Sequence, residues 1–380
     1  MIISMLERKI LKNHFKMESR LISTFFYCYK KNYVILILRR EDIMKILLYA
    51  EGLKVIGVSG LGKAILHQEK ALQSVKVDYT RDYKTFDYDI AHINTYFLKS
   101  YFLAKKLKRK GIKIVYHAHS TEEDYKDGFV GGHLTSKLFK WWIVKCYKLG
   151  DIIVTPTVYS KKILECYKGL KGKKIVAISN GLELDFFKPD KKYRESFRKR
   201  YNYKDTDKVI VGIGIYSRRK GIVDFVEVAK RLPDYKFIWF GSSPLAAATP
   251  DARHAVETKL PNLTFAGHVD QKYIKEALGG CDLFLFPTLE ETEGIPIIEA
   301  CAMKCPILVR DIEIFKDWFK EDVDVYKARD IDEFVIKTKK IVENKLPSLT
   351  DNAIKKAKEK DIKTVGKQLK EVYQEVLKKD

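Results

Sequence analysis

The sequence lacks long apolar runs. No uninterrupted stretch of its 380 residues approaches the ~20 that a membrane-spanning helix needs. It also lacks cysteines at C-x-x-C spacing, so neither a zinc site nor a disulfide framework is indicated. The six cysteines are scattered, and most lie in apolar segments: Cys28, Cys146, Cys166, Cys281, Cys301 and Cys305. These absences predict a soluble, cytoplasmic protein with reduced thiols.

Negative charge is scarce in one part of the chain only. The formal net charge is +22, and residues 44–200 hold an excess of 16 positive charges, whereas residues 201–380 hold an excess of one. A one-sided basic balance predicts an anionic partner for the first half, either nucleic acid or an anionic lipid surface. A lysine-rich solvated surface without a partner would have made both halves basic.

The length and the order of patterns predict an α/β protein of two domains. A chain of 380 residues is too long for one ordinary core. In the first half, residues 88–94 are typical of a strand, residues 98–108 of a helix and residues 113–119 of the next strand. Alternation of this kind indicates a parallel sheet covered by helices.

Residues 1–43 do not fit this alternation. They contain basic and aromatic patches, whereas residues 44–49 are typical of an opening strand. Our hypothesis is that Met44 is the true start and that residues 1–43 are not translated. The alternative is a genuine arm that touches a membrane.

One strand-to-helix loop holds an unusual pair of carboxylates. The apolar run 281–287 has strand length and ends at Pro287, and residues 297–303 are typical of the first turns of a helix, so Glu291 and Glu299 lie at either end of the connection. Ligands of open α/β sheets bind at such loops. The two carboxylates could therefore hold sugar hydroxyls; alternatively, they only complement the helix dipole.

The stretch from residue 290 to 300 resembles the E-x7-E signature of retaining glycosyltransferases of family 4. Glu291 and Glu299 occupy the two Glu positions, and Gly294 fits the pattern between them. Thr292 stands where Gly or Ser is common, and Glu293 where an aromatic residue is common. This departure is similar to the variant found in glycosyltransferases that add glucose to diacylglycerol.

The resemblance implies a GT-B fold, in which two Rossmann-like domains face a central cleft. Residues 44–200 would bind the acceptor, residues 201–355 would bind the nucleotide sugar, and a helix within 356–380 would return to the first domain. The polar run 190–207 would be the linker. No metal ion or other cofactor is required in this fold.

The resemblance also assigns donor-binding residues. Glu299 would bind the ribose hydroxyls, and Glu291, a candidate catalytic residue, would bind the donor sugar beside Gly294. Lys220 precedes Gly221 after the strand 208–214, and with Arg219 it would neutralise the donor diphosphate. The donor would be a nucleotide-linked hexose, by this analogy UDP-glucose. Retention without an evident nucleophile implies front-face displacement, in which the leaving phosphate helps deprotonate the acceptor.

A histidine at a strand end is the candidate on the acceptor side. His117 and His119 are two residues apart, so on a strand both face the same side. In the family a histidine at this strand end lies beside the reacting sugar, and His119, followed by Ser120, is the better match. The other histidine is expected to be structural.

A glycine-rich segment nearly forms a phosphate-binding P-loop. Residues 57–63 match G-x-x-x-x-G-K, but Ala64 offers no hydroxyl to a magnesium ion. We therefore expect the backbone around Gly62 to approach the donor or acceptor, and the side chain of Lys63 to matter little. The alternative from another class is a P-loop or nucleic-acid-binding protein, which leaves the glutamate pair unexplained.

The acceptor is less constrained than the reaction. The basic excess and the signature variant favour a membrane glycerolipid, with the enzyme bound peripherally to the inner face of the cell membrane and with no nucleic acid as partner. Tyr101, Phe102 and Trp141 or Trp142 would enter the interface. Alternatively, a helix at 136–148 packs Leu138, Trp141, Trp142 and Cys146 into the core. The basic residues would be Lys105, Lys106, Lys108, Arg109 and Lys110. A soluble sugar or glycan acceptor, or an epimerase of the same fold, are the alternatives.

Overall fold

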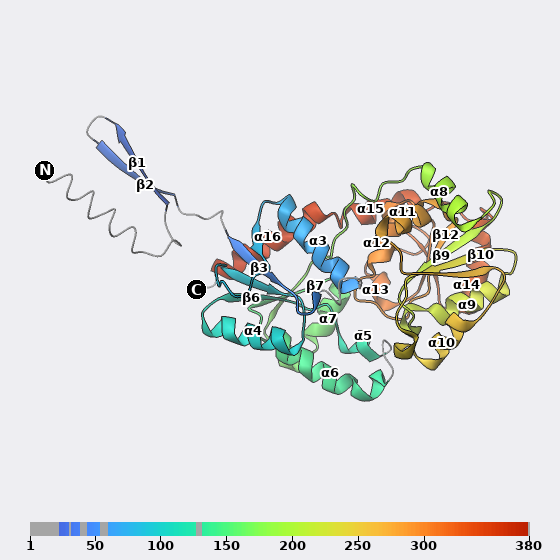
Figure 1. Cartoon of the computed structure of the whole chain (residues 1–380), viewed down its shortest axis with the longest axis horizontal. Helices are drawn as coiled ribbons and strands as arrows, with labels where there is room; N and C mark the ends of the chain where they lie inside the picture. Colours follow the sequence, from blue (N-terminus) through green and yellow to red (C-terminus); the bar gives the residue numbers. More distant parts are fainter. Residues whose placement is uncertain (1–22, 30–31, 39–43, 54–59, 127–130, 379–380) are drawn as a thin grey trace.

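The computed structural model describes residues 23–29, 32–38, 44–53, 60–126 and 131–378. Two six-stranded sheets, each covered by helices, lie side by side along the long axis of the molecule (Figure 1). Every strand pairing in both sheets is parallel. We call the units around these sheets the first and the second domain, and the predicted α/β architecture is confirmed.

The first domain is built on short strands that are buried on both faces, as parallel strands require. Ile152–Thr155, for example, is buried throughout. In spatial order the strands are β4 (Asp78–Thr80), β3 (Lys45–Tyr49), β5 (Ile90–Ile93), β6 (Lys113–His117), β7 (Ile152–Thr155) and β8 (Lys174–Ala177).

Helices cover both faces of this sheet, and each face has its own apolar cluster. One cluster includes α4 (Leu98–Arg109) and α6 (Gly132–Tyr147). The other includes α3 (Gly60–Ser74) and the last helix, α16 (Ile362–Lys378), so the end of the chain packs against the first domain. Two shorter helices, α5 (Glu122–Lys126) and α7 (Val158–Glu165), follow β6 and β7.

The second domain repeats the arrangement. Its strands in spatial order are β11 (Leu263–Gly267), β10 (Lys236–Phe240), β9 (Val209–Ile213), β12 (Leu283–Phe286), β13 (Ile307–Arg310) and β14 (Tyr326–Ala328). Its helices are α8 (Lys192–Tyr201), α9 (Ile222–Arg231), α10 (Pro250–Glu257), α11 (Gln271–Gly280), α12 (Ile295–Ala302), α13 (Glu313–Lys316), α14 (Ile331–Val342) and α15 (Thr350–Lys358).

The chain crosses between the domains twice, and the two crossings pair with each other. The Leu182 amide donates to the Lys360 carbonyl at 2.8 Å, and the Ile362 amide donates to the Leu182 carbonyl at 3.1 Å. The prediction that residues 190–207 form a linker is wrong. Most of this run is helix α8, which packs on α11, buries Phe197 completely and packs Tyr193 and Tyr201 against the same apolar cluster, so its aromatic side chains outweigh the polar composition.

The hypothesis about residues 1–43 concerns a segment that is largely outside the described residues. Within it the structure describes two antiparallel strands, β1 (Ser23–Tyr29) and β2 (Asn32–Leu38). Across all the described ranges, no helix combines the length and the apolar character that crossing a membrane requires.

Candidate active site

Loops at the carboxyl ends of both sheets meet between the domains. The Arg219 guanidinium, after β9, lies 2.7 Å from the carboxylate of Asp124, which is in α5 after β6. The Thr157 hydroxyl, after β7, donates to the Thr292 carbonyl, after β12, at 2.9 Å. Because ligands of parallel sheets bind at the carboxyl edge, this meeting place is the candidate active site.

The loop between β12 and α12 brings the acidic pair to this place. Gly294 precedes α12 with φ of 81°, a left-handed conformation that glycine adopts without strain. Pro296 lies in the first turn, where a missing amide proton costs nothing. Glu299 is fully buried and Glu291 is 4% exposed. Buried carboxylates require partners, and each of these has a cation beside it.

The Glu299 carboxylate receives donors from both domains. The Lys63 ammonium of α3 donates to Oε1 at 2.9 Å, and the Gln271 amide of α11 donates to the same oxygen at 2.6 Å. Oε2 is buried, and it has no hydrogen-bond partner among the residues that the structure describes. Lys63 was expected to matter little, so this contact is one that the sequence did not reveal.

The predicted phosphate-binding cations lie next to Glu291. Lys220 and Arg219 belong to the short turn of 3-10 helix Arg218–Lys220. The Lys220 ammonium donates to the Glu291 carboxylate, and burial lowers the pKa of Lys220 while Glu291 opposes this shift. The Arg219 guanidinium lies 3.9 Å from the same carboxylate. The structure therefore brings together three of the predicted donor-binding residues.

A carboxyl with a near-neutral pKa adjoins this cluster. Desolvation raises the pKa of Glu290 to about 7, the nearby Tyr159 hydroxyl opposes the shift, and Asp124 adds to it. The Arg219 guanidinium also donates to the Glu290 carbonyl at 3.0 Å. A site rich in carboxylates thus keeps one of them partly protonated near pH 7.

His119 lies at the end of a stack of three imidazoles. The ring centroids of His117 and His119 are 3.9 Å apart, and those of His92 and His117 are 5.3 Å apart. Desolvation lowers the pKa of His119 to about 3. The ring is therefore neutral at physiological pH.

A buried network fixes the orientation of this neutral ring. His119 Nε2 lies 2.9 Å from Asn94 Oδ1, which also accepts from the Gln68 amide at 2.8 Å. Because Asn94 Oδ1 is an acceptor, Nε2 carries the proton, and Nδ1 is left to accept a hydrogen bond from a hydroxyl. His117, with Nδ1 2.8 Å from the same Gln68 amide, is buried within the network and fits the structural role expected for it.

Glu293 has a role that the sequence pattern did not reveal. Its buried carboxylate accepts hydrogen bonds from the Ser179 hydroxyl, from the Asn180 amide at 2.9 Å and from the Asn180 side chain at 2.7 Å. Ser179 and Asn180 precede the first crossing between the domains. Glu293 therefore ties the signature loop to that crossing.

The glycine-rich segment is described only from residue 60 onward. Gly62 is buried in the first turn of α3, and residues 54–59 of the P-loop-like motif lie outside the described residues.

The residues expected to face a membrane lie on two neighbouring helices of the first domain. Tyr101 of α4 and Trp142 of α6 are in ring contact, with centroids 5.2 Å apart. The alternative that α6 packs into the core is confirmed for Cys146, but it is wrong for Leu138 and Trp141, because α6 buries its opposite face. Both helices carry exposed apolar side chains, which we call the apolar ridge: Leu98 and Phe102 of α4, and Leu134, Leu138 and Trp141 of α6. The basic cluster occupies the end of α4: Lys105, Lys106, Lys108, Arg109 and Lys110.

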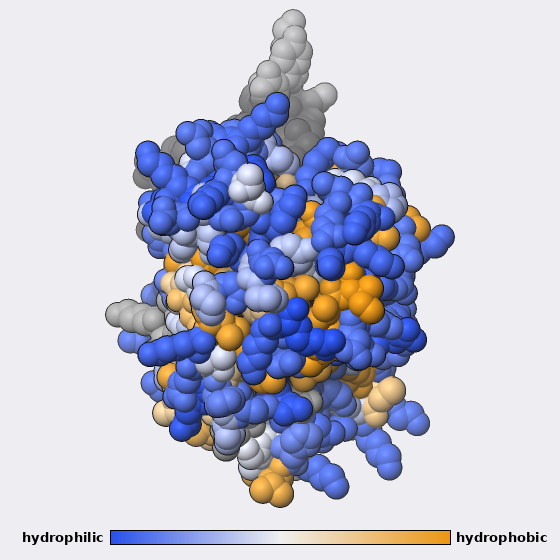
Figure 2. Space-filling model, turned by 90° about the vertical axis from the view of Figure 1, so that its right-hand side faces the viewer, coloured by the Kyte–Doolittle hydropathy of each residue, from blue (hydrophilic) through white to orange (hydrophobic). Residues whose placement is uncertain are grey.

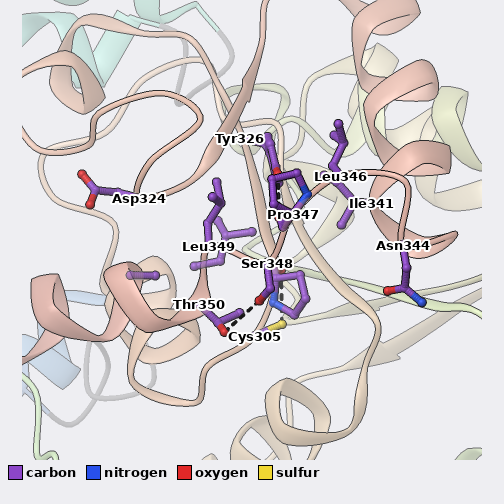
Figure 3. A pocket seen from close by; sticks show the side chains of 13 residues that line it. Cys305, Asp324, Tyr326, Ile341, Asn344, Leu346, Pro347, Ser348, Leu349 and Thr350 are labelled. Carbon is purple, nitrogen blue, oxygen red and sulfur yellow. Dashed lines mark hydrogen bonds between the residues drawn. The ribbon is translucent and has the colours of Figure 1, made fainter.

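The outer face of the second domain differs from this ridge. Figure 2 shows that face covered mainly by hydrophilic residues, with apolar residues in scattered groups. A pocket in the second domain, between α14, α15 and β14, is lined by residues such as Cys305, Tyr326 and Thr350 (Figure 3). None of the predicted site residues lines it, so it is separate from the candidate active site.

Within the described ranges, no group of three or more His, Cys, Asp or Glu side chains is placed to hold a metal ion.

Comparison with known proteins agrees with this geometry in both domains. A family model described as Glycosyltransferase Family 4 matches residues 67–186, and one described as Glycosyl transferases group 1 matches residues 193–360. The processive diacylglycerol alpha-glucosyltransferase of Acholeplasma laidlawii is 35% identical over 88% of this chain and 99% of its own length. The alpha-galactosylglucosyldiacylglycerol synthase of Streptococcus pneumoniae is 26% identical over 76% of this chain and 78% of its own length.

Solved structures show the same architecture. Sucrose-phosphate synthase from Thermosynechococcus elongatus superposes with a TM-score of 0.70 at 15% identity, over 88% of this chain and 99% of that one. Two parallel sheets whose carboxyl edges face each other, together with the likeness to these solved structures, define the GT-B fold. The family models and the relatives show that the protein is a glycosyltransferase. The chain belongs to family 4 of these enzymes, as the signature loop predicted.

Proposed function

We propose that this enzyme transfers glucose from UDP-glucose to diacylglycerol, with retention of configuration, at the inner face of the cell membrane. The observation that carries the proposal is the 35% identity, over nearly the whole length of the relative, to a diacylglycerol alpha-glucosyltransferase. Identity of that extent covers both the acceptor side and the donor side of the site.

The donor half of the proposal is supported by the charges of the second domain. Glu299 presents a buried oxygen that needs a hydroxyl donor, and a ribose supplies one. Lys220 and Arg219 lie beside Glu291 and would exchange that carboxylate for the donor diphosphate. Cations at that place stabilise the negative charge that develops on the leaving nucleotide.

The acceptor half is supported by His119 and by the surface of the first domain. With Nε2 protonated toward Asn94, the other ring nitrogen of His119, Nδ1, is suited to accept a hydrogen bond from the attacking hydroxyl. The apolar ridge offers side chains that can enter a bilayer interface, and the basic cluster offers charges for anionic headgroups. A lipid acceptor can then enter the cleft from the membrane.

Incubation with radiolabelled nucleotide sugars tests the activity. With UDP-glucose and diacylglycerol vesicles, label is expected to enter the organic phase in a product that an α-glucosidase cleaves and a β-glucosidase does not. Other labelled nucleotide sugars, and vesicles without diacylglycerol, are the controls. Label that remains on a water-soluble sugar or glycan would contradict the lipid acceptor and leave the glycosyltransferase activity intact.

Replacing all five residues of the basic cluster with Gln is expected to weaken membrane binding strongly. Each basic residue near an anionic surface contributes about 1 kcal/mol, and the attraction is screened beyond ~8 to 10 Å. Sedimentation with anionic vesicles should show less binding and a weaker salt dependence. Transfer to lipid should fall, whereas hydrolysis of free UDP-glucose should be unchanged.

A matched variant separates this surface from net charge. It removes five exposed lysines from the second domain instead: Lys339, Lys340, Lys345, Lys355 and Lys358. That variant should bind vesicles like the unmodified enzyme. Equal losses in both variants would show that overall charge, rather than the first-domain surface, governs docking.

A further inference from the structure

The contact between Lys63 and Glu299 joins residues that are 236 positions apart and belong to different domains. Lys63 holds Oε1 of the carboxylate together with Gln271, while the buried Oε2 is without a partner among the described residues. One oxygen is therefore held by two protein donors, and the other is suited to a hydroxyl. A buried polar atom without a partner is uncommon, and beside the candidate active site it is a place where a ligand hydroxyl can bind.

The position of Lys63 is unfavourable unless it has a partner. It lies in the first turn of α3, where the helix carries positive partial charge and disfavours a cation. Glu299, fully buried, is far more costly without a counter-charge. The ion pair relieves both costs, and it forms only where the first domain meets the second.

We propose that Lys63 is a positioning residue for the donor: it orients Glu299 so that Oε2 receives a ribose hydroxyl, and it thereby makes nucleotide binding by the second domain depend on contact with the first. The inference rests on the proposed function, in which Glu299 binds the ribose. Gln271 supports the same orientation from within the second domain.

Two other roles for Lys63 give different results. A lysine that contacts the donor phosphates directly would act without Glu299. A lysine that competes with the ribose for Glu299 would weaken binding, and its removal would tighten it. The proposed role requires that the effect pass through the Glu299 carboxylate and that it concern the nucleoside part of the donor.

A double-mutant cycle tests this requirement. Lys63→Met removes the charge and keeps a side chain of similar length, whereas Lys63→Arg keeps the charge. Each variant is measured both in the unmodified enzyme and in a Glu299→Gln background. Calorimetry gives the affinity for UDP, competition against transfer gives the inhibition constants of uridine and UDP, and thermal unfolding checks that each variant is folded. Lys63→Met should weaken UDP and uridine alike, by about tenfold, because one charge-assisted contact is lost.

The Glu299→Gln background and the Lys63→Arg variant distinguish the proposed role of Lys63 from the two other roles. In the Glu299→Gln background, Lys63→Met should change UDP affinity by less than about twofold, and Lys63→Arg should restore most of the affinity in the unmodified background. The KM for UDP-glucose should rise more than kcat falls. A loss confined to UDP, an equal loss in both backgrounds, or tighter binding would each overturn the inference while leaving the proposed function standing. Failure of the unmodified enzyme to bind UDP would overturn both.

Discussion

Glu299→Ala and Lys220→Ala are each expected to lower kcat/KM for glucosyl transfer by about 10² to 10³ while the protein stays folded. Glu299 is the buried carboxylate whose Oε2 awaits a hydroxyl, so its loss removes the nucleoside contact. Lys220 is the buried cation beside Glu291, so its loss removes the charge that would stabilise the leaving diphosphate. Each is a charge-assisted contact worth about 1.5 to 3 kcal/mol in binding alone.

The two variants are expected to differ in how they fail. Glu299→Ala should weaken both uridine and UDP, whereas Lys220→Ala should weaken UDP and leave uridine nearly unchanged, because a nucleoside has no phosphate. Calorimetry with both ligands measures the difference. Lys230→Ala and Glu227→Ala, which replace an ion pair on the surface of α9, are the matched controls and should behave like the unmodified enzyme. Unchanged UDP affinity in both site variants would place the donor outside the second domain.

Local patterns carried much of what the sequence could predict. Strands buried on both faces are short apolar runs, and the turn from β12 to α12 has glycine and proline at positions with known backbone requirements. The signature loop could therefore be located, and Glu291, Lys220 and Arg219 do converge from two different loops of the second domain. Their chemical roles remain predictions for the variants above.

Contacts between distant segments could not be predicted in the same way. Nothing near Lys63 in the sequence indicates Glu299, because their meeting depends on how two separately folded domains dock. The burial of the α6 side chains could not be predicted for another reason. This helix has apolar residues on more than one face, so composition could not show that Cys146 is buried while Trp141 and Leu138 are exposed. The exposed side chains of α6 indicate a membrane-facing surface only when they are considered together with those of α4.

Glu293→Ala is expected to loosen the junction between the domains and to lower transfer at least tenfold. The substitution removes the acceptor of three hydrogen bonds from Ser179 and Asn180, in a place that water does not reach. Each buried donor left without a partner costs about 1 to 3 kcal/mol, so the free energy of unfolding should fall by several kcal/mol. Thermal unfolding and small-angle scattering measure the stability and the spread of domain orientations.

The reason for expecting an effect on activity is geometric. Asn180 leads into the crossing at Leu182, which pairs with the returning chain at Lys360 and Ile362, so Glu293 reaches from the signature loop to this crossing. A loosened crossing would let the domains separate, which should lower transfer more than UDP binding, because the proposed acceptor and donor sites lie on different domains. Glu293→Gln keeps the shape and one acceptor oxygen, and it should lose less than Glu293→Ala. Glu313→Ala, which removes an exposed carboxylate of α13 that is paired with Lys316, controls for charge and should leave stability and activity unchanged. A Glu293→Ala protein as stable and as active as the unmodified enzyme would show that the junction is held by its other contacts, such as the bond from Thr157 to Thr292.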